Sequence, residues 1–307
     1  DFRIGKGETF SLVGESGCGK TSLGRCALGL LHPTGGHVLF EGARLDRLSG
    51  AALRKARRRM QYIFQDPQAS LDPRMTVERV ISEPLEVHRL VKGRQQRRQR
   101  VTELLEQVEL SGELLDRYPH ELSGGQRQRV ATARALASEP RFVVADEPTS
   151  SLDVPIRAQI LDLLGRLQRD AGLAYLLISH DLPAVRRMAH KVAVMYLGRV
   201  VEQGPADRVC RDPLHPYSQA LVAAEPRLPG SDDAGAERGQ IPALEGDVPS
   251  PMDPPTGCPF HPRCAVYREL QGSRCAELLP TLQATEREDH LVACHEIPAG
   301  PREGTEQ

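Results

Sequence analysis

The stretch GESGCGKT, residues 14–21, constrains this chain more than any other feature. It fits the pattern G-x-x-x-x-G-K-[ST] and lies between an apolar run at 9–14, expected to be a buried strand, and a helical pattern at 20–31. Its three glycines let the backbone curl so that N–H groups face a phosphate. The following helix adds the positive end of its dipole. A chance glycine-rich turn is the alternative, and the flanking strand and helix argue against it.

The side chains of this loop supply the remaining phosphate chemistry. Lys20 can place an ammonium on the β- and γ-phosphates of a nucleotide. Thr21 can offer a hydroxyl to Mg²⁺, with Ser22 as a second hydroxyl. Cys18 occupies a free position of the pattern and receives no side-chain role. The residues expected to bind the phosphates are Gly14, Ser16, Gly17, Cys18, Gly19, Lys20, Thr21 and Ser22.

A second acidic motif follows an apolar run later in the chain. In FVVADE, residues 142–147, the apolar residues predict a strand that ends at Asp146 and Glu147. NTPases hold Mg²⁺ at such a carboxylate, so Asp146 is the expected metal-holding residue, through water. Glu147 would then polarise the attacking water as general base. An ordinary acidic strand end is the alternative, and the phosphate loop upstream lowers its weight.

Strand-like and helical patterns alternate along the chain, which favours an α/β core. Residues 66–136 carry helical patterns and almost no strand signal, so a mostly helical insertion is expected there. A hairpin is expected at 191–204, with Gly198 near its turn. Further strands are expected at 37–42, 60–65, 141–146 and 174–179, and helices at 101–110, 124–138 and 155–170.

Composition argues against several classes of protein. Of the 307 residues 39% are hydrophobic and 26% charged, and the formal net charge is -1, so no overall field attracts nucleic acid or an anionic membrane. Apolar runs fall short of the ~18 residues of a membrane span. The sequence opens without a basic-then-apolar leader. Seven cysteines then favour a reducing compartment, where metal binding or burial is commoner than disulfides.

The segment ELSGGQRQR, residues 121–129, indicates the class of NTPase. Ser123 and two glycines open a helix whose N-terminus offers a hydroxyl, N–H groups and a positive dipole end to a second phosphate site. The segment resembles the signature of ATP-binding cassette (ABC) ATPases. The resemblance implies that this site serves the ATP of a partner subunit, so that two ATP molecules lie head to tail between two chains. The signature residues are Leu122, Ser123, Gly124, Gly125 and Gln126.

Three more segments follow the order typical of that family. Gln65 in FQDPQ resembles the Q-loop, which reports on the γ-phosphate. Asp153 in SSLD resembles the D-loop at the dimer interface, and His180 in ISHD resembles the switch histidine. A lone histidine at a strand end is usually structural, but five elements in one order argue against that interpretation. The resemblance implies catalytic roles for Glu147, His180 and Gln65, and a Mg²⁺ ion held by Thr21, Gln65 and Asp146.

The resemblance also implies the fold class, an α/β P-loop NTPase of the ABC nucleotide-binding type with a helical signature subdomain and a small cysteine-containing C-terminal extension. The aromatic residue that stacks on adenine in the family lies upstream of Asp1, so we expect a truncated N-terminus. The expected domains are an ABC ATPase domain at 1–205 with its helical subdomain at about 66–136, an extension and Pro/Gly-rich linker at 206–256, a four-cysteine segment at 257–296, and a flexible tail at 297–307.

Two segments outside the catalytic core indicate a branch of the family. DPLHPYSQAL (212–221) and PSPMDPPTGCPFHPRC (249–264) resemble the ATPase subunits of dipeptide and oligopeptide importers. The resemblance implies a subunit that binds ATP and Mg²⁺ and hydrolyses ATP to power peptide import. Its partners would be two transmembrane permeases, a second ATPase subunit that is a paralogue by family habit, and indirectly an external substrate-binding protein. The chain would then be peripheral, on the cytoplasmic face of the cell membrane.

Other functions stay open at this point. Importers of nickel or another small solute share much of the pattern. A soluble ABC ATPase of translation or DNA repair needs no permease, and the arginine runs at 54–59 and 94–100 could contact nucleic acid. The near-neutral charge and the single cassette favour solvated faces instead, with no nucleic-acid partner. The intact catalytic residues argue against a subunit without activity.

The last third of the chain carries four cysteines with irregular spacing, Cys258, Cys264, Cys275 and Cys294. Zinc ribbons favour two C-x₂-C pairs, which this segment lacks, although His261 and His295 could be further zinc ligands. An iron–sulfur cluster tolerates such spacing, and buried thiols are the third interpretation. Spacing leaves the three open. The resemblance to peptide-importer ATPases implies a [4Fe-4S] cluster with a structural role.

Overall fold

The computed structural model describes residues 1–224, 246–270, 274–298 and 300. The chain divides into two compact units, one formed by Asp1–Phe10 and Thr21–Ser179 and the other by Ser11–Lys20 and His180–Gln307. The linker predicted within 206–256 falls at 225–245 outside the described residues, as does most of the tail predicted at 297–307.

The first unit contains three parallel strands in the order β4 (Met60–Ile63), β5 (Phe142–Asp146) and β6 (Ala174–Ile178). All five residues of β6 and four of the five in β5 are buried, as expected for parallel strands covered on both faces. Because parallel strands end at the same edge, the residues that follow β4 and β5 come together there. This edge carries Gln65, Asp146 and Glu147.

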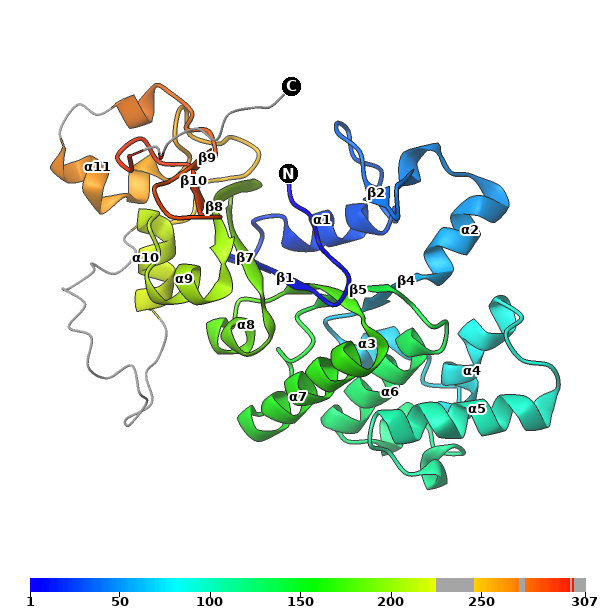
Figure 1. The fold of residues 1–307 in the computed structure, drawn as a ribbon. Coiled ribbons are helices and arrows are strands. Elements are labelled where there is room, and N and C mark those ends of the chain that lie inside the picture. The colour runs from blue at the N-terminus through cyan, green and yellow to red at the C-terminus, as the bar shows by residue number, and fades with distance from the viewer. Residues whose placement is uncertain (225–245, 271–273, 299, 301–307) are drawn as a thin grey trace. The chain divides into compact units, whose positions relative to one another are not determined.

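Helices make up most of the rest of the first unit (Figure 1). Residues 64–141, all described, contain helices and no strand, and the helices expected at 101–110, 124–138 and 155–170 are confirmed as α5, α6 and α7. In this part of Figure 1, α4, α5 and α6 lie against one another. The helices are α1 (Lys20–Ala27), α2 (Gly50–Arg58), α3 (Pro67–Ser70), α4 (Val77–Val87), α5 (Arg94–Gln107), α6 (Gly124–Leu136) and α7 (Val154–Ala171), with 3₁₀ turns at Leu45–Arg47, Gly112–Leu114 and Pro119–Glu121.

Two expected elements are shorter than their patterns. The helix expected at 20–31 ends at Ala27, because Gly29 adopts a φ of 63° and the N–H of Leu30 turns back to the Arg25 carbonyl. The strand expected at 37–42 is reduced to β2 (Leu39–Phe40), paired with β3 (Ala43–Arg44). Leu39 is 59% exposed, so this segment lacks the buried face that would extend it.

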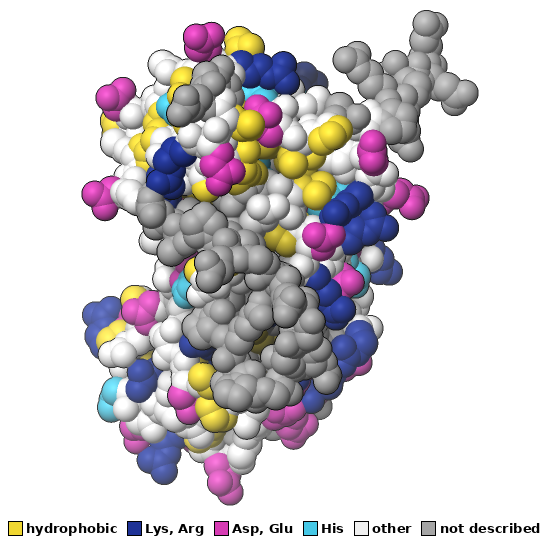
Figure 2. Space-filling view, turned by 90° about the vertical axis from the view of Figure 1, so that its left-hand side faces the viewer, with side chains coloured by type: hydrophobic (Ala, Val, Ile, Leu, Met, Phe, Trp, Pro, Cys, Tyr) yellow, Lys and Arg dark blue, Asp and Glu magenta, His cyan; other side chains and the backbone are white. Residues whose placement is uncertain are grey.

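The arginine run at 94–100 lies on α5 and is matched by acids. Arg97 pairs with Glu86, and Arg98 pairs with Glu78 and Asp116. Such exposed pairs contribute little stability each, but they neutralise the run. On the face drawn in Figure 2, basic and acidic side chains are likewise interspersed among the described residues.

The second unit is built on an antiparallel hairpin of β7 (Lys191–Tyr196) and β8 (Arg199–Pro205), turned at Gly198 as expected. β10 (Leu291–Val292) pairs with β8, and β9 (Gln283–Ala284) pairs with β10. Its helices are α8 (Leu182–Met188), α9 (Ala206–Arg211), α10 (Pro216–Ala223) and α11 (Ala265–Glu269), with 3₁₀ turns at His261–Arg263 and Arg274–Ala276.

The core of the second unit joins the hairpin to the C-terminal segment. Val194 and Tyr196 of β7, Tyr217 of α10 and Phe260 belong to one buried cluster, together with Cys258, Cys264 and Cys275. β1 (Thr9–Val13), which is buried along its whole length, crosses the boundary between the units in sequence and ends in the second, just before the phosphate loop. Among the described residues no helix combines the length and the apolar character needed to span a membrane.

Candidate nucleotide-binding site

The phosphate loop begins where β1 ends and lies against the β7–β8 hairpin. Gly14 has a φ of 151°, and a Cβ there would lie 2.2 Å from the carbonyl oxygen of Met195. Only glycine permits this approach. The hairpin holds the loop at its far side too, because the N–H of Gly198 donates to the Cys18 carbonyl at 2.9 Å. Burial raises the pKa of the Cys18 thiol against the influence of Lys20, which agrees with a packed side chain.

Lys20 closes the loop on itself. Its side chain is 5% exposed, and Nζ donates to the carbonyl oxygens of Gly14 and Glu15 at 2.8 and 2.9 Å. Backbone carbonyls are suitable acceptors for the three N–H donors of an ammonium group, so these contacts hold the Lys20 side chain beside the loop's N–H groups. Ser16 and Gly17, by contrast, are exposed at the tip. The loop therefore combines a positive charge with accessible backbone donors.

In the first unit a hydroxyl and a carboxylate lie together at the edge of the sheet. Thr21, in the first turn of α1, donates from Oγ1 to Asp146 Oδ1 at 3.2 Å. The other oxygen of Asp146 accepts a hydrogen bond of 2.5 Å from the hydroxyl of Tyr62 on β4. Asp146 is 3% exposed. Burial, and then the neighbouring carboxylate, raises the pKa of Tyr62, so the phenol stays a proton donor.

Thr21 and Asp146 fit a Mg²⁺ ion by their chemistry. Mg²⁺ prefers oxygen ligands and is usually held by one or two protein groups, with phosphates and water completing the shell. Ser22 follows Thr21 on α1 and is exposed. The structure thus brings together two of the three residues expected at the metal, while Gln65 contacts Glu147 instead.

Glu147 directly follows β5 in an unusual backbone conformation. Its φ is 45°, a left-handed value that costs a residue with a side chain roughly 1–2 kcal/mol. The strained turn is supported by its N–H, which donates to the Ile178 carbonyl of β6 at 2.8 Å. Its carboxylate accepts a hydrogen bond of 2.8 Å from Nε2 of Gln65. Such strain commonly occurs at functional sites, and here it turns the carboxylate toward the exposed Gln65.

The signature segment forms the N-terminus of α6. Ser123 is the N-cap, and a capping box joins its Oγ to the N–H of Gln126 and the Gln126 side chain to the Ser123 N–H. Leu122 is buried, whereas Ser123 and Gly124 are exposed. A Cβ on Gly125 would lie 2.7 Å from Ile156. This first turn therefore packs on the start of α7, whose N-cap is the exposed Asp153.

His180 belongs to the second unit, two residues after the end of β6, and is exposed. Its predicted contact to a γ-phosphate stays a prediction, and the exposed imidazole is accessible to such a ligand.

The four cysteines of the C-terminal segment line one small cavity, which we call the cysteine cavity. Its volume is about 20 Å³, close to the space of one water. Burial raises the pKa of Cys258 to about 11 and also raises those of Cys264 and Cys294. His261 and His295 border the same cavity.

The predicted metal site in this segment receives no support. Within the described residues no group of three or more His, Cys, Asp or Glu side chains is arranged to hold a metal ion. The thiols line a gap of about 20 Å³ at the edge of an apolar core. The four cysteines do line one cavity, as a shared site requires, but neither the iron–sulfur cluster nor the zinc ion gains support from the described residues.

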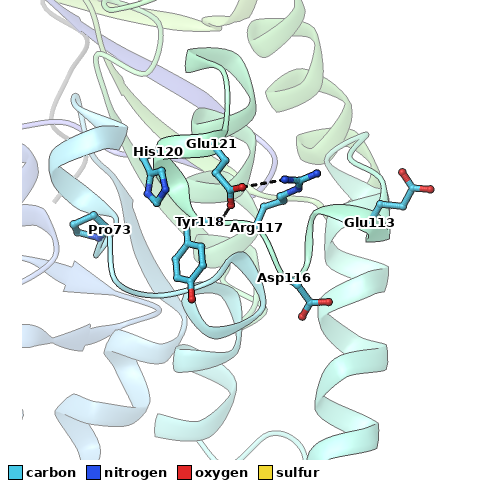
Figure 3. Close-up of a pocket in the computed structure, with 7 residues that line it drawn as sticks. All are labelled: Pro73, Glu113, Asp116, Arg117, Tyr118, His120 and Glu121. Atoms are coloured by element: carbon cyan, nitrogen blue, oxygen red, sulfur yellow. Dashed lines mark hydrogen bonds and ion pairs between the residues drawn. The ribbon is translucent and has the colours of Figure 1, made fainter.

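A larger pocket of about 530 Å³ lies in the helical part of the first unit (Figure 3). Arg117 and the N–H of Tyr118 both bond to Glu121, which fixes one wall. Tyr118 stacks on His120 and is 40% exposed. The lining residues are Pro73, Glu113, Asp116, Arg117, Tyr118, His120 and Glu121.

Sequence reasoning missed the side chains that support the predicted site. The sequence indicates only that Tyr62 lies in a strand, whereas the structure shows that its hydroxyl donates to Asp146. Glu15 fills a variable position of the loop pattern, yet it forms an ion pair with Arg263. No local pattern could have found that pair, because its members lie 248 residues apart.

Comparison with known proteins places the chain in a family. Residues 1–150 match the family described as ABC transporter, and residues 201–269 match the oligopeptide/dipeptide transporter C-terminal region. A probable peptide ABC transporter ATP-binding protein of Sinorhizobium fredii is 49% identical over 96% of this chain and 80% of its own length. A putative oligopeptide transport ATP-binding protein of Bacillus subtilis is 46% identical over 96% of this chain and 87% of its own length.

A solved structure agrees with these relatives. A dimeric ATP-binding cassette in a post-hydrolysis state, bound to ADP and phosphate, is 32% identical with a TM-score of 0.61, covering 67% of this chain and 88% of that one. The α/β cassette fold predicted from the sequence is confirmed by this likeness and by the family match. The chain belongs to the ABC transporter family of ATP-binding proteins and carries the C-terminal region of its oligopeptide/dipeptide branch.

Proposed function

We propose that this chain binds and hydrolyses ATP to power the import of di- and oligopeptides through a membrane complex. The observation that carries the proposal is the pairing of an ABC cassette with the oligopeptide/dipeptide C-terminal region in one chain. Relatives that align over most of this chain are named as peptide transporters' ATP-binding proteins. The C-terminal region lies outside the catalytic core, so it discriminates between branches better than the ATP motifs do.

In this proposal the phosphate loop binds the triphosphate of ATP. The exposed tip at Ser16 and Gly17 offers backbone donors, and α1 adds the positive end of its dipole. Lys20 would exchange its two carbonyl contacts for β- and γ-phosphate oxygens. Thr21 and Asp146 would hold Mg²⁺, which neutralises charge on those oxygens. The residues proposed to bind the phosphates remain Gly14, Ser16 to Lys20, Thr21 and Ser22.

Glu147 is the proposed general base. Its carboxylate would accept a proton from the attacking water as the water oxygen bonds to the γ-phosphorus and the bond to the β-phosphate oxygen breaks, giving ADP and phosphate. The hydrogen bond from Gln65 supports this role, because it fixes the direction of the carboxylate. It also gives Gln65 a means to report the state of the site. His180 would contact the γ-phosphate.

The partner subunits are proposed on the same basis. The exposed N-terminus of α6 at Ser123 and Gly124 would face ATP held by a second ATPase subunit, with Asp153 at the interface. The pocket beside Tyr118 and His120 would receive a segment of a permease, with this stacked aromatic pair as its contact and the charged residues of the lining around it (Figure 3). The chain would then act as a peripheral subunit on the cytoplasmic face of the membrane.

Reconstitution tests the proposal. The chain is assembled with its two permeases and second ATPase subunit in proteoliposomes that enclose ATP and Mg²⁺, and labelled tripeptide or Ni²⁺ is added with the external binding protein. We expect ATP-dependent uptake of peptide and no uptake of Ni²⁺. Lys20→Ala should abolish both uptake and hydrolysis, and Ser123→Arg should block hydrolysis at the partner's site. Uptake of Ni²⁺ but not peptide would refute the proposed substrate.

A further inference from the structure

A buried arginine connects the C-terminal segment to the phosphate loop within the second unit. Arg263, at the end of the 3₁₀ turn that precedes Cys264, is 7% exposed. Its Nη1 donates to Glu15 Oε2 at 2.8 Å and its Nη2 to Glu15 Oε1 at 3.1 Å. Two parallel bonds of this kind fix direction as well as distance. Glu15 is the second residue of the loop, so the contact reaches the proposed phosphate site.

The side chains around Arg263 hold its guanidinium in place beside Glu15. Its guanidinium carbon lies 5.9 Å from the centre of the Tyr196 ring, and Nη1 also reaches the Tyr196 hydroxyl at 3.4 Å. The hydrogen bonds to Glu15 raise the pKa of Arg263 further, so the charge is permanent. A buried guanidinium that loses its carboxylate would keep an uncompensated charge.

A second contact holds the backbone of the same loop residue. The N–H of Glu15 donates to the hydroxyl of Tyr217 at 2.9 Å. Tyr217 lies on α10, is completely buried, and packs its ring 4.8 Å from that of Tyr196 and 5.4 Å from that of Phe260. The position of the hydroxyl is therefore set by the packed core and not by the loop.

These contacts leave the backbone of Glu15 little freedom. Its carboxylate is bound by Arg263 and its N–H by Tyr217, and neither is a contact that Lys20 would give up to a phosphate ligand. Fixing a backbone residue costs conformational entropy when it happens on binding. A loop that is already fixed avoids this cost, which strengthens the binding of a phosphate ligand.

We propose that Arg263 and Tyr217 are positioning residues for the phosphate loop, through which the C-terminal segment sets the affinity of the cassette for ATP. The inference rests on the proposed function, since it takes the loop to bind ATP. It gives the segment around the cysteine cavity a role in the ATPase cycle that needs no metal. It also explains why an arginine is buried against the Tyr196 ring in the core of this unit.

Nucleotide affinity of the full chain tests the inference. MgATP is titrated calorimetrically, and ATPase rates are measured over a range of ATP concentrations. We expect Arg263→Met to weaken binding and raise KM about ten-fold with a smaller change in kcat, and Tyr217→Phe about five-fold. Arg263→Lys should recover part of the loss. The double variant Glu15→Gln, Arg263→Met should bind ATP no more weakly than the weaker-binding single variant, because the two substitutions remove the same interaction.

Two controls separate this inference from the proposed site. Exposed Arg199→Met on β8 should bind ATP as the parent chain does. Lys20→Ala should lose ATP binding, and normal binding by that variant would refute the phosphate site itself. If Lys20→Ala loses binding while Arg263→Met and Tyr217→Phe keep the parent KM and lower only the thermal midpoint, Arg263 and Tyr217 are structural and the inference is overturned.

Discussion

Removing one hydroxyl beside Asp146 tests how the predicted metal-holding carboxylate is supported. In Tyr62→Phe the ring keeps its buried place, at 8% exposure, and the 2.5 Å hydrogen bond to Asp146 is lost. Asp146 is 3% exposed, so water has little access to replace the lost donor. A hydrogen bond to a charged group contributes about 1.5–3 kcal/mol. We therefore expect the free energy of unfolding to fall by about that amount.

The assay is the thermal midpoint by circular dichroism. One kcal/mol shifts the midpoint of a chain of a few hundred residues by about 2–3 °C, so Tyr62→Phe should melt about 3–9 °C lower. Tyr118→Phe is the matched control, because Tyr118 is 40% exposed and its substitution should change the free energy of unfolding by no more than about 0.5 kcal/mol. Equal midpoints for Tyr62→Phe and the parent would refute the reasoning.

The same pair makes a prediction about pH. Burial and Asp146 raise the pKa of Tyr62 in the folded state. A raised folded pKa gives a stabilisation that is complete below the unfolded pKa of about 10 and is lost as the pH rises above it. The stability gap between parent and Tyr62→Phe should therefore be constant from pH 7 to 9 and shrink above pH 10. A gap that widens there would contradict the assignment.

Two further predictions concern the second unit. Burial raises the pKa of Cys258 to about 11, so at pH 8 iodoacetamide should label the half-buried Cys26 at least about ten-fold faster than Cys258. Urea should remove this difference in labelling rate. Peptide mass spectrometry measures the two rates, and equal rates in the native protein would contradict the buried thiol cavity. Burial also lowers the pKa of His215 to about 4. The neutral imidazole therefore contributes up to about 3 kcal/mol to the free energy of unfolding, in full above pH 6.5, and this contribution is lost on acidification toward pH 4. His215→Asn should flatten the urea midpoint against pH in this window, and an unchanged slope would show that another group carries the acid sensitivity.

The sequence predicted the position of a residue well wherever that residue lies at the end of a strand or at the start of a helix. Asp146 is the last residue of β5 and Thr21 lies in the first turn of α1, and the two side chains are hydrogen-bonded. The end of the strand and the start of the helix could each be predicted from local patterns. The N-cap of α6 at Ser123 was likewise visible in LSGGQ, because a capping serine and a glutamine three residues later act within one turn.

What the sequence left out depends on contacts between distant segments. Arg263 and Glu15 pair across 248 positions, and Tyr62 reaches Asp146 across 84. Neither pair has a local signature, because an arginine near cysteines and a tyrosine in a strand have many ordinary roles. The strand predicted at 37–42 is too long for a related reason. Its apolar residues predict burial, but Leu39 does not pack against another layer and is exposed.

The turnover of Glu147→Gln in the assembled transporter tests the central claim most directly. Glutamine keeps the size of the side chain and its contact with Gln65, but it cannot accept the proton of the attacking water. The account predicts that ATP hydrolysis falls by about 10²-fold or more while ATP binding and ATP-dependent pairing of the two ATPase subunits persist. Hydrolysis at the parent rate would contradict the claim that this chain is an ABC ATPase acting through Glu147.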